Sequence, residues 1–500
     1  MIMKRFLTLS LACAVALATW AVQVNTTAGN LSQVVTDNSI NQLSITGTID
    51  ARDFKFMASE LSNLVSLNLT NAEIVAYNDK QSPLFFNVTN YEAGTIPAGA
   101  FMGKKLRNVL LPSSLKSIEL AAFAGCGDLE VITFPQSLDT IGAYAFSACN
   151  KLRTIAIPQN LKYLGDGAFS RCDGLKSATI KPAIDFAVGK DAFQDCKSLS
   201  SLTLGQNVTE IKAGAFAGCS SLSAPVIEQS SKLGSIAEAA FAGSGLETIA
   251  LDQCNNLVSV GMWAFANTPL KNVALPQSLE SLGDGAFYYN LDMETIDLPA
   301  GINSLSDYLL AGNNNVITDQ PVKNGVTSIG DYAFYNWDEI QEFIFPASVQ
   351  HIGTKAMAGQ VNLNQVVAEP TTVPELGDEV WAGVPQHRIP LKVDASVKDD
   401  YRSAEQWMEF KIEDIPTTIN DNVADATSSV RAHFSGTVLV VNATAAIAKI
   451  SVFDTRGVLL SATTPATEQA QVETANFTGK FYIVNVILSD GTKHTFKLVR

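Results

Sequence analysis

The pattern of apolar positions repeats along most of the 500-residue chain, with a period of 22 to 25 residues. Each unit holds one short apolar run, then a second, and then a large apolar residue that we call the anchor. The anchors are Phe101, Phe123, Phe146, Phe169, Phe193, Phe216, Phe241, Phe265, Phe287, Leu310, Phe334, Met357 and Trp381. A fixed period of this length indicates a solenoid, in which each unit forms one coil and contacts only its neighbours.

The unit from 129 to 149 shows how one coil is expected to fold. Ile132 and Phe134 alternate with other residues, which predicts a short strand whose apolar side chains face the core. Pro135 ends that strand because it has no N–H to donate. Gly142 is then expected to turn the chain, through a positive φ or a close backbone approach. Its equivalents are Gly165, Gly283, Gly330 and Gly353.

The sequence outside the repeats departs from this pattern. Residues 52–61 are expected to form a helix and residues 64–74 a strand, and Ser396 is expected to cap a second helix. The apolar face of that second helix comprises Val397, Tyr401, Ala404, Trp407 and Phe410. The expected segments are 1–21 (signal peptide), 22–95 (N-terminal cap), 96–390 (solenoid), 391–415 (C-terminal cap), 416–428 (linker) and 429–500 (a small β-sandwich).

The predicted fold class is therefore a mixed α/β repeat solenoid of about thirteen coils, each of about 23 residues, followed by a small all-β sandwich. The net charge of −15 limits the classes of binding partner that we expect. Residues 1–21 carry +2 and residues 429–500 carry +3, so residues 22–428 carry −20. A body this acidic repels phosphate backbones, and we expect no nucleic-acid partner.

The first 21 residues predict export. Lys4 and Arg5 precede an apolar run over 6–18, and Ala18-Thr19-Trp20-Ala21 offers a cleavage site near residue 21. The run is shorter than the roughly 20 residues of a membrane-spanning helix, so the mature chain is expected to have no membrane span. Lipidation at Cys13 is an alternative to simple cleavage.

Five cysteines occupy one repeated position, three residues after an anchor. They are Cys126, Cys149, Cys172, Cys196 and Cys219. This placement predicts a ladder of buried, reduced thiols that behave as small apolar side chains. A disulfide between neighbouring rungs is the alternative. No Cys-x-x-Cys pair occurs, so we expect no zinc site.

The unit Ile-Gly-x-x-Ala-Phe-x-x-Cys-x-x-Leu-x-x-Ile-x-x-Pro resembles the treponemal-type leucine-rich repeat, also called BspA-like, over about residues 95–390. The ending that contains Tyr401, Ala404, Trp407 and Phe410 resembles the terminal cap of that family. The resemblance implies a curved right-handed solenoid. It also implies a surface or secreted protein that binds host matrix proteins or other bacteria.

The tail resembles the C-terminal sorting domain of the type IX secretion system of Bacteroidetes. The matching residues are Val452-Phe453-Asp454-x-x-Gly457, Gly479-Lys480-Phe481-Tyr482-Ile483-Val484, Gly491 and Lys497-Leu498-Val499. The Pro-Asn-Pro-like stretch often found ahead of the first strand is replaced by "ATSSVRAHFSG" at 426–436. The resemblance implies that residues 429–500 engage the type IX machinery and deliver the chain to the outer-membrane surface or the extracellular medium.

No catalytic, cofactor-binding or metal-binding residues are predicted. The four histidines share no motif, and the chain has no Gly-x-Ser-x-Gly elbow, phosphate loop or calcium loop. We therefore expect a non-enzymatic leucine-rich-repeat protein that mediates adhesion or binding. Its expected partners are a host matrix protein, a glycan or other bacterial cells. A structural surface component without a soluble ligand and a carboxylate-dependent hydrolase are the alternatives.

Two sets of residues are candidates for binding. The outward positions of the strands offer hydroxyl-bearing residues at Thr133, Thr154, Thr179 and Thr203. Aromatic residues follow two later anchors at Tyr288, Tyr289, Tyr335 and Trp337. The competing interpretations are that threonine simply suits an exposed strand, and that the aromatic residues are partly buried filling on the convex side.

Overall fold

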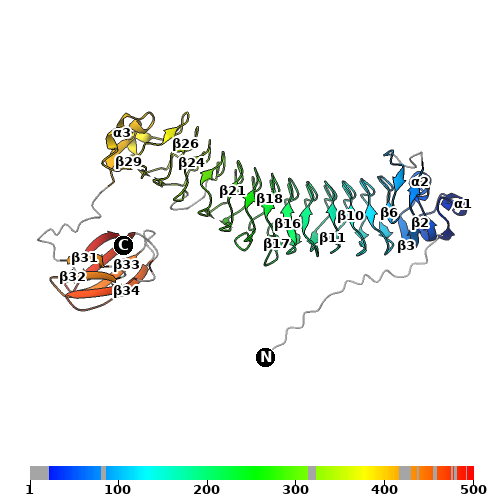
Figure 1. The fold of residues 1–500 in the computed structure, drawn as a ribbon, viewed down its shortest axis with the longest axis horizontal. Coiled ribbons are helices and arrows are strands. Elements are labelled where there is room, and N and C mark those ends of the chain that lie inside the picture. The colour runs from blue at the N-terminus through cyan, green and yellow to red at the C-terminus, as the bar shows by residue number, and fades with distance from the viewer. Residues whose placement is uncertain are drawn as a thin grey trace, which may run out of the picture. The chain divides into compact units, whose positions relative to one another are not determined.

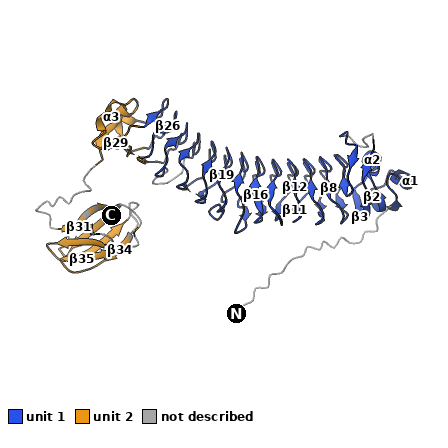
Figure 2. Cartoon of the chain, viewed as in Figure 1, with its two compact units in different colours: residues 1–340, 348–362, 374–384 blue, residues 341–347, 363–373, 385–500 orange. Residues whose placement is uncertain are grey.

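The computed structural model describes residues 22–79, 86–313, 322–415, 430–435, 438–453, 459–474, 477, 481–490 and 493–499. The chain forms two compact units (Figure 2). Unit 1 comprises residues 1–340, 348–362 and 374–384, and unit 2 comprises 341–347, 363–373 and 385–500. The expected signal peptide, the linker over 416–428 and the Asp454-x-x-Gly457 turn lie outside the described residues.

Unit 1 begins with three parallel strands and two helices. Strands β1 (Val22–Thr26), β2 (Gln42–Ile49) and β3 (Ser66–Ile74) lie side by side, and β3 pairs with the first strand of the repeats. Helix α1 (Leu31–Val34) precedes β2, and helix α2 (Ala51–Ser59) follows it. The helix expected over 52–61 and the strand expected over 64–74 are confirmed. A small antiparallel pair, β4 (Tyr77–Asn78) and β5 (Asn90–Tyr91), precedes the first coil.

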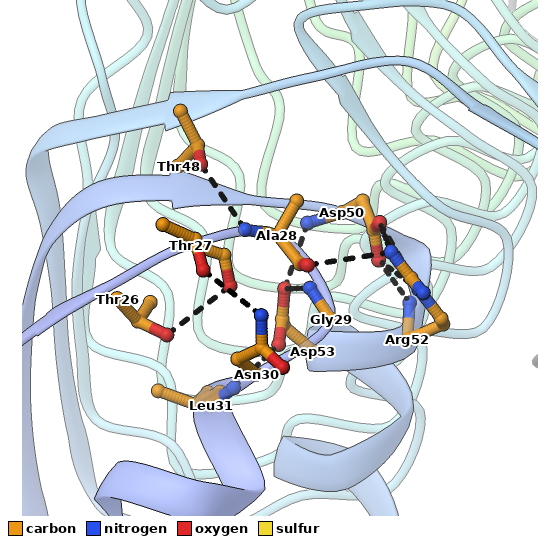
Figure 3. Close-up of polar contacts among 10 residues, drawn as sticks. All are labelled: Thr26, Thr27, Ala28, Gly29, Asn30, Leu31, Thr48, Asp50, Arg52 and Asp53. Atoms are coloured by element: carbon orange, nitrogen blue, oxygen red, sulfur yellow. Dashed lines mark hydrogen bonds and ion pairs between the residues drawn. The ribbon is translucent and has the colours of Figure 1, made fainter.

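Buried Asp53 ties the start of the chain to helix α2 (Figure 3). Its carboxylate accepts backbone N–H groups of Gly29 at 2.7 Å, Leu31 at 2.9 Å and Asp50 at 2.9 Å. Asp50 caps the helix by accepting the Arg52 N–H at 2.9 Å, and its carboxylate also pairs with the Arg52 guanidinium. Two reciprocal caps of this kind satisfy backbone donors that the first helical turn leaves without partners.

The coils stack through a first ladder of parallel strands (Figure 1). In unit 1 these strands are β7 (Asn108–Leu110), β9 (Val131–Ile132), β11 (Thr154–Ile157), β13 (Ser177–Ile180), β15 (Ser201–Leu204), β17 (Val226–Ile227), β20 (Asn272–Ala274) and β22 (Thr295–Asp297). In unit 2 they are β25 (Glu342–Phe345), β27 (Gln365–Ala368), β29 (Pro390–Val393) and β30 (Lys411–Asp414). Inward and outward residues alternate along them, as the sequence pattern predicted.

A second parallel ladder stands where the sequence suggested only a turn, so that expectation was wrong. Its strands are β6 (Thr95–Ile96), β8 (Ser117–Ile118), β10 (Thr140–Ile141), β12 (Tyr163–Leu164), β14 (Phe186–Val188), β16 (Val208–Ile211), β18 (Ser235–Ile236), β19 (Ser259–Val260), β21 (Ser281–Leu282), β23 (Ser304–Leu305), β24 (Ser328–Ile329), β26 (His351–Ile352) and β28 (Glu375–Leu376). Ile141, for example, is in register with Ile118 on one side and Leu164 on the other. Most of these strands have two residues, too few to show the alternation that identifies a strand in sequence.

The thirteen anchors form the centre of the core, and all are buried. From Phe101 to Phe287, each phenylalanine ring stacks on the next with centroids 5.1 to 5.6 Å apart. Offset stacking of this kind adds to the free energy of burial. The expected solenoid of about thirteen coils is therefore confirmed.

The chain takes a left-handed backbone conformation two residues before and two residues after every anchor. The φ values are +51° to +66° at the first position and +54° to +81° at the second. Gly142 and its equivalents are not among these residues. A Cβ at Gly142 would lie 2.8 Å from backbone atoms of the preceding coil, and one at Gly165 would lie 2.4 Å away. Of the two roles expected for these glycines, close backbone approach is the one observed.

The cysteine ladder is confirmed as a run of buried free thiols. Each of the five Sγ atoms donates to the carbonyl of the anchor in the preceding coil, at 3.0 to 3.3 Å. Asn313 occupies the same position in a later coil, and its Nδ2 donates to the Phe287 carbonyl at 3.0 Å. Burial raises the pKa of Cys126 to about 12. The sixth described cysteine, Cys254, is also free and lies outside this ladder.

The C-terminal cap belongs to unit 2, and its helix is shorter than expected. Helix α3 (Lys398–Ser403) gives way to a single 3₁₀ turn, η2 (Trp407–Glu409). The helical backbone is interrupted between them because Gln406 has a φ of +61°. Ser396 does not cap α3: the residue at that position is Val397, and the Ser396 hydroxyl donates to Asp394 at 2.6 Å. Four of the five expected apolar residues are nevertheless buried: Val397, Tyr401, Trp407 and Phe410.

The C-terminal residues form a β-sandwich of two antiparallel sheets, as expected. One sheet contains β31 (Val430–Ser435), β32 (Val438–Ala443) and β35 (Gln469–Glu473). The other has the order β34 (Leu459–Thr463), β33 (Ile447–Phe453), β36 (Phe481–Leu488) and β37 (Lys493–Val499). Its core is built from its own residues, among them Leu439, Val441, Ile450, Val452, Tyr482 and Val484. Throughout the described parts of the chain, no helix has the length and hydropathy that a membrane span requires.

Candidate binding surfaces

The first ladder aligns its outward residues in rows that run from coil to coil. Thr154 is in register with Ser177, and Ser177 with Ser201. In the neighbouring row, Thr179 is in register with Thr203. The structure therefore brings two of the four predicted threonines opposite each other and places Thr154 one row away.

Thr133 directly follows β9 and is exposed. Thr154 is also exposed, whereas Thr179 and Thr203 are half-buried. Across β11, β13 and β15 the rows consist of small hydroxyl-bearing and methyl-bearing side chains that present hydrogen-bonding groups without charge. Such a flat face offers many weak contacts and lacks the large anchors of a tight interface.

Six aromatic side chains form a second surface, which we call the aromatic cluster. It consists of Trp263, Tyr288, Tyr289, Tyr308, Tyr332 and Tyr335. Tyr308 and Tyr332 stack with centroids 4.8 Å apart, and Tyr288 meets Trp263 edge-on at 5.1 Å. Tyr289 and Tyr335 are the most exposed members, at 47% and 36%.

The sequence identified three members of this cluster and missed three. Tyr288, Tyr289 and Tyr335 were predicted, whereas Trp263, Tyr308 and Tyr332 were not. The missed residues all lie two positions before an anchor, at the left-handed position of their coil. Comparing that one position in successive units would have found them, because the repeat places equivalent residues side by side.

Trp337 does not belong to this surface, and the expectation that it contacts a partner is corrected. Its side chain is fully buried, and its ring stacks on Phe334 at 5.1 Å. It occupies the rung three residues after an anchor that cysteine fills in earlier coils. The alternative interpretation, an aromatic residue that fills the interior, holds for this residue.

Glycines make room for the exposed rings. A Cβ at Gly285 would lie 2.5 Å from the Trp263 ring, and one at Gly312 would lie 2.8 Å from the Tyr289 ring. Gly167 has the same relation to Tyr144, whose ring a Cβ would meet at 2.5 Å. Each ring therefore lies across a glycine of the next coil, at the equivalent left-handed position.

Carboxylates border the aromatic cluster. Asp307 accepts the backbone N–H of Asp331 at 2.7 Å, and Asp331 accepts that of Thr354 at 2.6 Å. Burial raises the pKa of Tyr308, and the neighbouring Tyr332 and these two carboxylates raise it further. The surface is thus aromatic and electronegative at once.

A shallow cavity of about 500 Å³ lies near the first coils, lined by Tyr91, Lys116, Glu119, Asp139 and neighbouring residues. Histidine and cysteine are absent from its described lining. Within the described parts of the chain, no cluster of three histidine, cysteine or acidic side chains is arranged to hold a metal ion.

Residues 94–389 match, in overlapping segments, a family model described as "BspA type Leucine rich repeat region (6 copies)". The segments are 94–223, 186–317, 232–364 and 314–389, which together span more than half of the chain. The chain belongs to the BspA-type leucine-rich repeat family. No curated protein matches the sequence.

Several solved structures of leucine-rich repeat proteins are similar to this chain. A leucine-rich repeat protein from Bacteroides ovatus is 21% identical with a TM-score of 0.54, and the match covers 66% of this chain and 90% of that one. The T. pallidum leucine-rich repeat protein is 31% identical with a TM-score of 0.28, covering 32% and 74% of the two chains. A leucine-rich cell surface protein from Faecalibacterium prausnitzii is 21% identical with a TM-score of 0.29, covering 57% and 85%.

The family match places the two candidate surfaces on a repeat architecture. In this BspA-type chain, both the threonine rows and the aromatic cluster are built by residues that recur at fixed positions of the unit. A change at one position therefore alters one rung of a surface and leaves the neighbouring coils in place.

Proposed function

We propose that this chain is an exported repeat protein that binds other macromolecules at the cell surface and catalyses no reaction. The observation that carries the proposal is the aligned outward face of the first ladder, where Thr179 and Thr203 stand in register and Thr154 lies in the next row. A regular face of this kind suits repeated contacts with an extended partner. A host matrix protein, a glycan or a neighbouring bacterial cell offers such a partner.

The proposal is tested by direct binding of the mature chain, residues 22–500, to immobilised matrix proteins, glycans and bacterial cells. We expect saturable binding to at least one of them. Replacing Thr179→Lys and Thr203→Lys adds two charges and bulk to the face and is expected to abolish that binding. Thr140→Lys is the matched control, because Thr140 is a half-buried threonine on the second ladder.

Binding that is insensitive to the threonine changes would move the site elsewhere on the solenoid. A folded chain that binds nothing on the panel would contradict the proposal and favour a structural component of the surface. Circular dichroism of each variant separates lost binding from lost structure.

We further propose that the chain leaves the cell through residues 1–21 and 429–500, with the tail engaging type IX secretion machinery. Support comes from the sequence resemblance and from the tail's own core, which makes it a separate β-sandwich. Deleting residues 430–500 is expected to leave the solenoid inside the cell envelope, as measured by surface labelling of intact cells. Unchanged surface labelling of the truncated chain would refute this route, and the Thr140→Lys chain should export normally.

A further inference from the structure

We propose that the aromatic cluster, together with Asp284, Asp307 and Asp331, is a docking surface for a polypeptide segment rich in lysine and arginine. The proposal rests on the binding role proposed above and adds a second site with a defined partner chemistry. It follows from the charge of these coils, the setting of the carboxylates and the geometry of the rings.

Charge is distributed unevenly along the solenoid. Between residues 261 and 340 the sequence has ten acidic residues and two lysines, whereas between 101 and 200 it has nine acidic and twelve basic residues. The two lysines are already paired, Lys271 with Glu247 at 3.2 Å and Lys323 with Asp297 at 2.8 Å. The later coils therefore carry a negative potential that attracts a basic partner.

Two of the carboxylates are fixed beside the rings. Asp284, Asp307 and Asp331 each lie three residues before an anchor, and the left-handed residues that follow them are Gly285, Tyr308 and Tyr332. Asp307 and Asp331 are held by backbone N–H groups of the following coil, at 2.7 and 2.6 Å. Among the described residues, none of the three has a salt-bridge partner, so each is open to a basic ligand.

The rings complement the long stems and charged ends of basic side chains. Tyr289 and Tyr335 are substantially exposed, and the other members are partly exposed. Lysine and arginine pack their aliphatic stems on aromatic surface and place their charge over ring faces or against hydroxyl oxygens. Carboxylates within reach then add charge-assisted hydrogen bonds.

Lys355 shows this combination within the chain itself. It occupies the equivalent left-handed position one coil after Tyr332, and its ammonium group pairs with Glu379 at 3.1 Å. Glu379 raises the pKa of Lys355, and Tyr332 and Tyr335 raise it further. A basic side chain thus already pairs with a carboxylate and interacts electrostatically with two tyrosines of the cluster.

A neutral glycan fits this surface less well. Sugar rings stack on open aromatic faces, but Tyr308 and Tyr332 cover one another, with ring planes only 4° apart. The flanking carboxylates accept hydrogen bonds and donate none. The cluster therefore favours a partner that brings positive charge and donors.

The test measures the fluorescence anisotropy of a labelled peptide in which arginine and lysine alternate with glycine, titrated with residues 22–500. About eight residues suffice, because coils repeat every ~4.8 Å and an extended chain advances ~3.3 Å per residue. Tyr308→Gly with Tyr332→Gly removes the stacked pair, and glycine suits their φ values of +56° and +55°. We expect roughly tenfold weaker binding.

Tyr144→Gly is the matched control. Tyr144 occupies the same position of its coil, has a φ of +53° and is 49% exposed, but it lies among the more basic early coils. Its replacement should leave peptide affinity unchanged. Asp284→Asn should weaken binding and reduce its dependence on salt.

Equal affinity of the wild type and the tyrosine double variant would overturn the docking surface and indicate non-specific attraction to an acidic chain. Tyrosine-dependent binding of a neutral oligosaccharide, with no binding of the peptide, would also overturn it. Because Tyr308→Gly removes packing, Tyr289→Ser with Tyr335→Ser provides an exposed pair that tests the same surface. Retention of panel binding by a variant that loses the peptide would leave the threonine-face proposal standing.

Discussion

At the scale of single residues, the repeat is built on backbone conformations that its side chains do not favour. Of the 26 left-handed positions that flank the anchors, only 11 are glycine. The compensation comes from hydrogen bonds between coils: Tyr144, Phe146 and Ala148 each donate a backbone N–H to the next coil, at 2.7 to 2.8 Å. A left-handed residue other than glycine costs roughly 1–2 kcal/mol, and these bonds hold it in place.

The cost of a left-handed alanine predicts opposite effects on stability for two neighbouring alanine-to-glycine changes. Ala148→Gly relieves a φ of +59° and is expected to stabilise the chain by about 0.5–1 kcal/mol, after the greater entropy of unfolded glycine is subtracted. Ala145→Gly is the matched control, because Ala145 is fully buried and lies outside the left-handed positions. It should destabilise by about 1–2 kcal/mol. Denaturant midpoints followed by tyrosine and tryptophan fluorescence decide the matter, and a lower midpoint for Ala148→Gly would contradict it.

Because the ladder thiols are buried, we predict that the chain loses stability at alkaline pH. Burial raises the pKa of Cys126 to about 12 and that of Cys149 well above its ordinary value. In the unfolded chain these thiols ionise above pH ~8.5, whereas in the native chain they stay protonated. The free energy of unfolding that the buried thiols contribute is therefore fully present below pH ~8.5. It is lost as the pH rises toward the pKa that these thiols have in the native chain.

The measurement is the denaturant midpoint between neutral pH and pH ~10.5, in the wild type and in a Cys126→Ser, Cys149→Ser variant. Tyrosine titration is common to both proteins, so the comparison isolates the thiols. We expect a shallower decline in the variant. Parallel declines would show that the thiols contribute nothing to the pH dependence.

At the scale of elements, the sequence predicted those strands and helices that are long enough to show a period of apolar residues. The alternation of Ile155 and Ile157 marks a four-residue strand, and the helix expected over 52–61 is helix α2. The second ladder escaped detection because a pair such as Thr140–Ile141 has one inward side chain and no period. Helix α3 was extended too far because spacing alone does not reveal the left-handed Gln406 that interrupts it.

Helix α2 depends on one buried carboxylate, and this gives a prediction at the element scale. Asp53→Ala removes the acceptor of three backbone N–H groups and should destabilise the N-terminal cap by about 2–4 kcal/mol. Hydrogen exchange of residues 27–35 should accelerate markedly. Asp37→Asn is the control, because Asp37 is exposed and bonds only to Ser39. Unchanged protection in the Asp53→Ala chain would show that Asp53 does not hold the cap.

At the scale of the whole molecule, the period alone predicted the solenoid, because every anchor from Phe101 to Trp381 occupies the same buried position. The candidate surfaces were less accessible to sequence reasoning. Tyr308 and Tyr332 lie 24 residues apart in the chain and 4.8 Å apart in space, so their stacking appears only once the register of the coils is known. Trp337 was wrongly expected to contact a partner, because composition alone does not distinguish an exposed aromatic residue from one that packs in the interior of the solenoid.

The described core of the C-terminal sandwich lies within residues 430–488, with Phe496 and Leu498 packed against it, which predicts that the sandwich melts independently. Calorimetry of residues 22–500 should resolve two transitions, and deleting residues 416–500 should remove one of them. The remaining transition should keep its midpoint within about 2 °C, because domains with separate cores unfold as separate units. Replacing the core residue Val484→Ala should lower only the transition that the deletion removes, by a cavity cost of about 1–3 kcal/mol. A single transition that shifts as a whole in either variant would show that sandwich and solenoid fold as one cooperative unit, and export of the two parts would then have to be considered together.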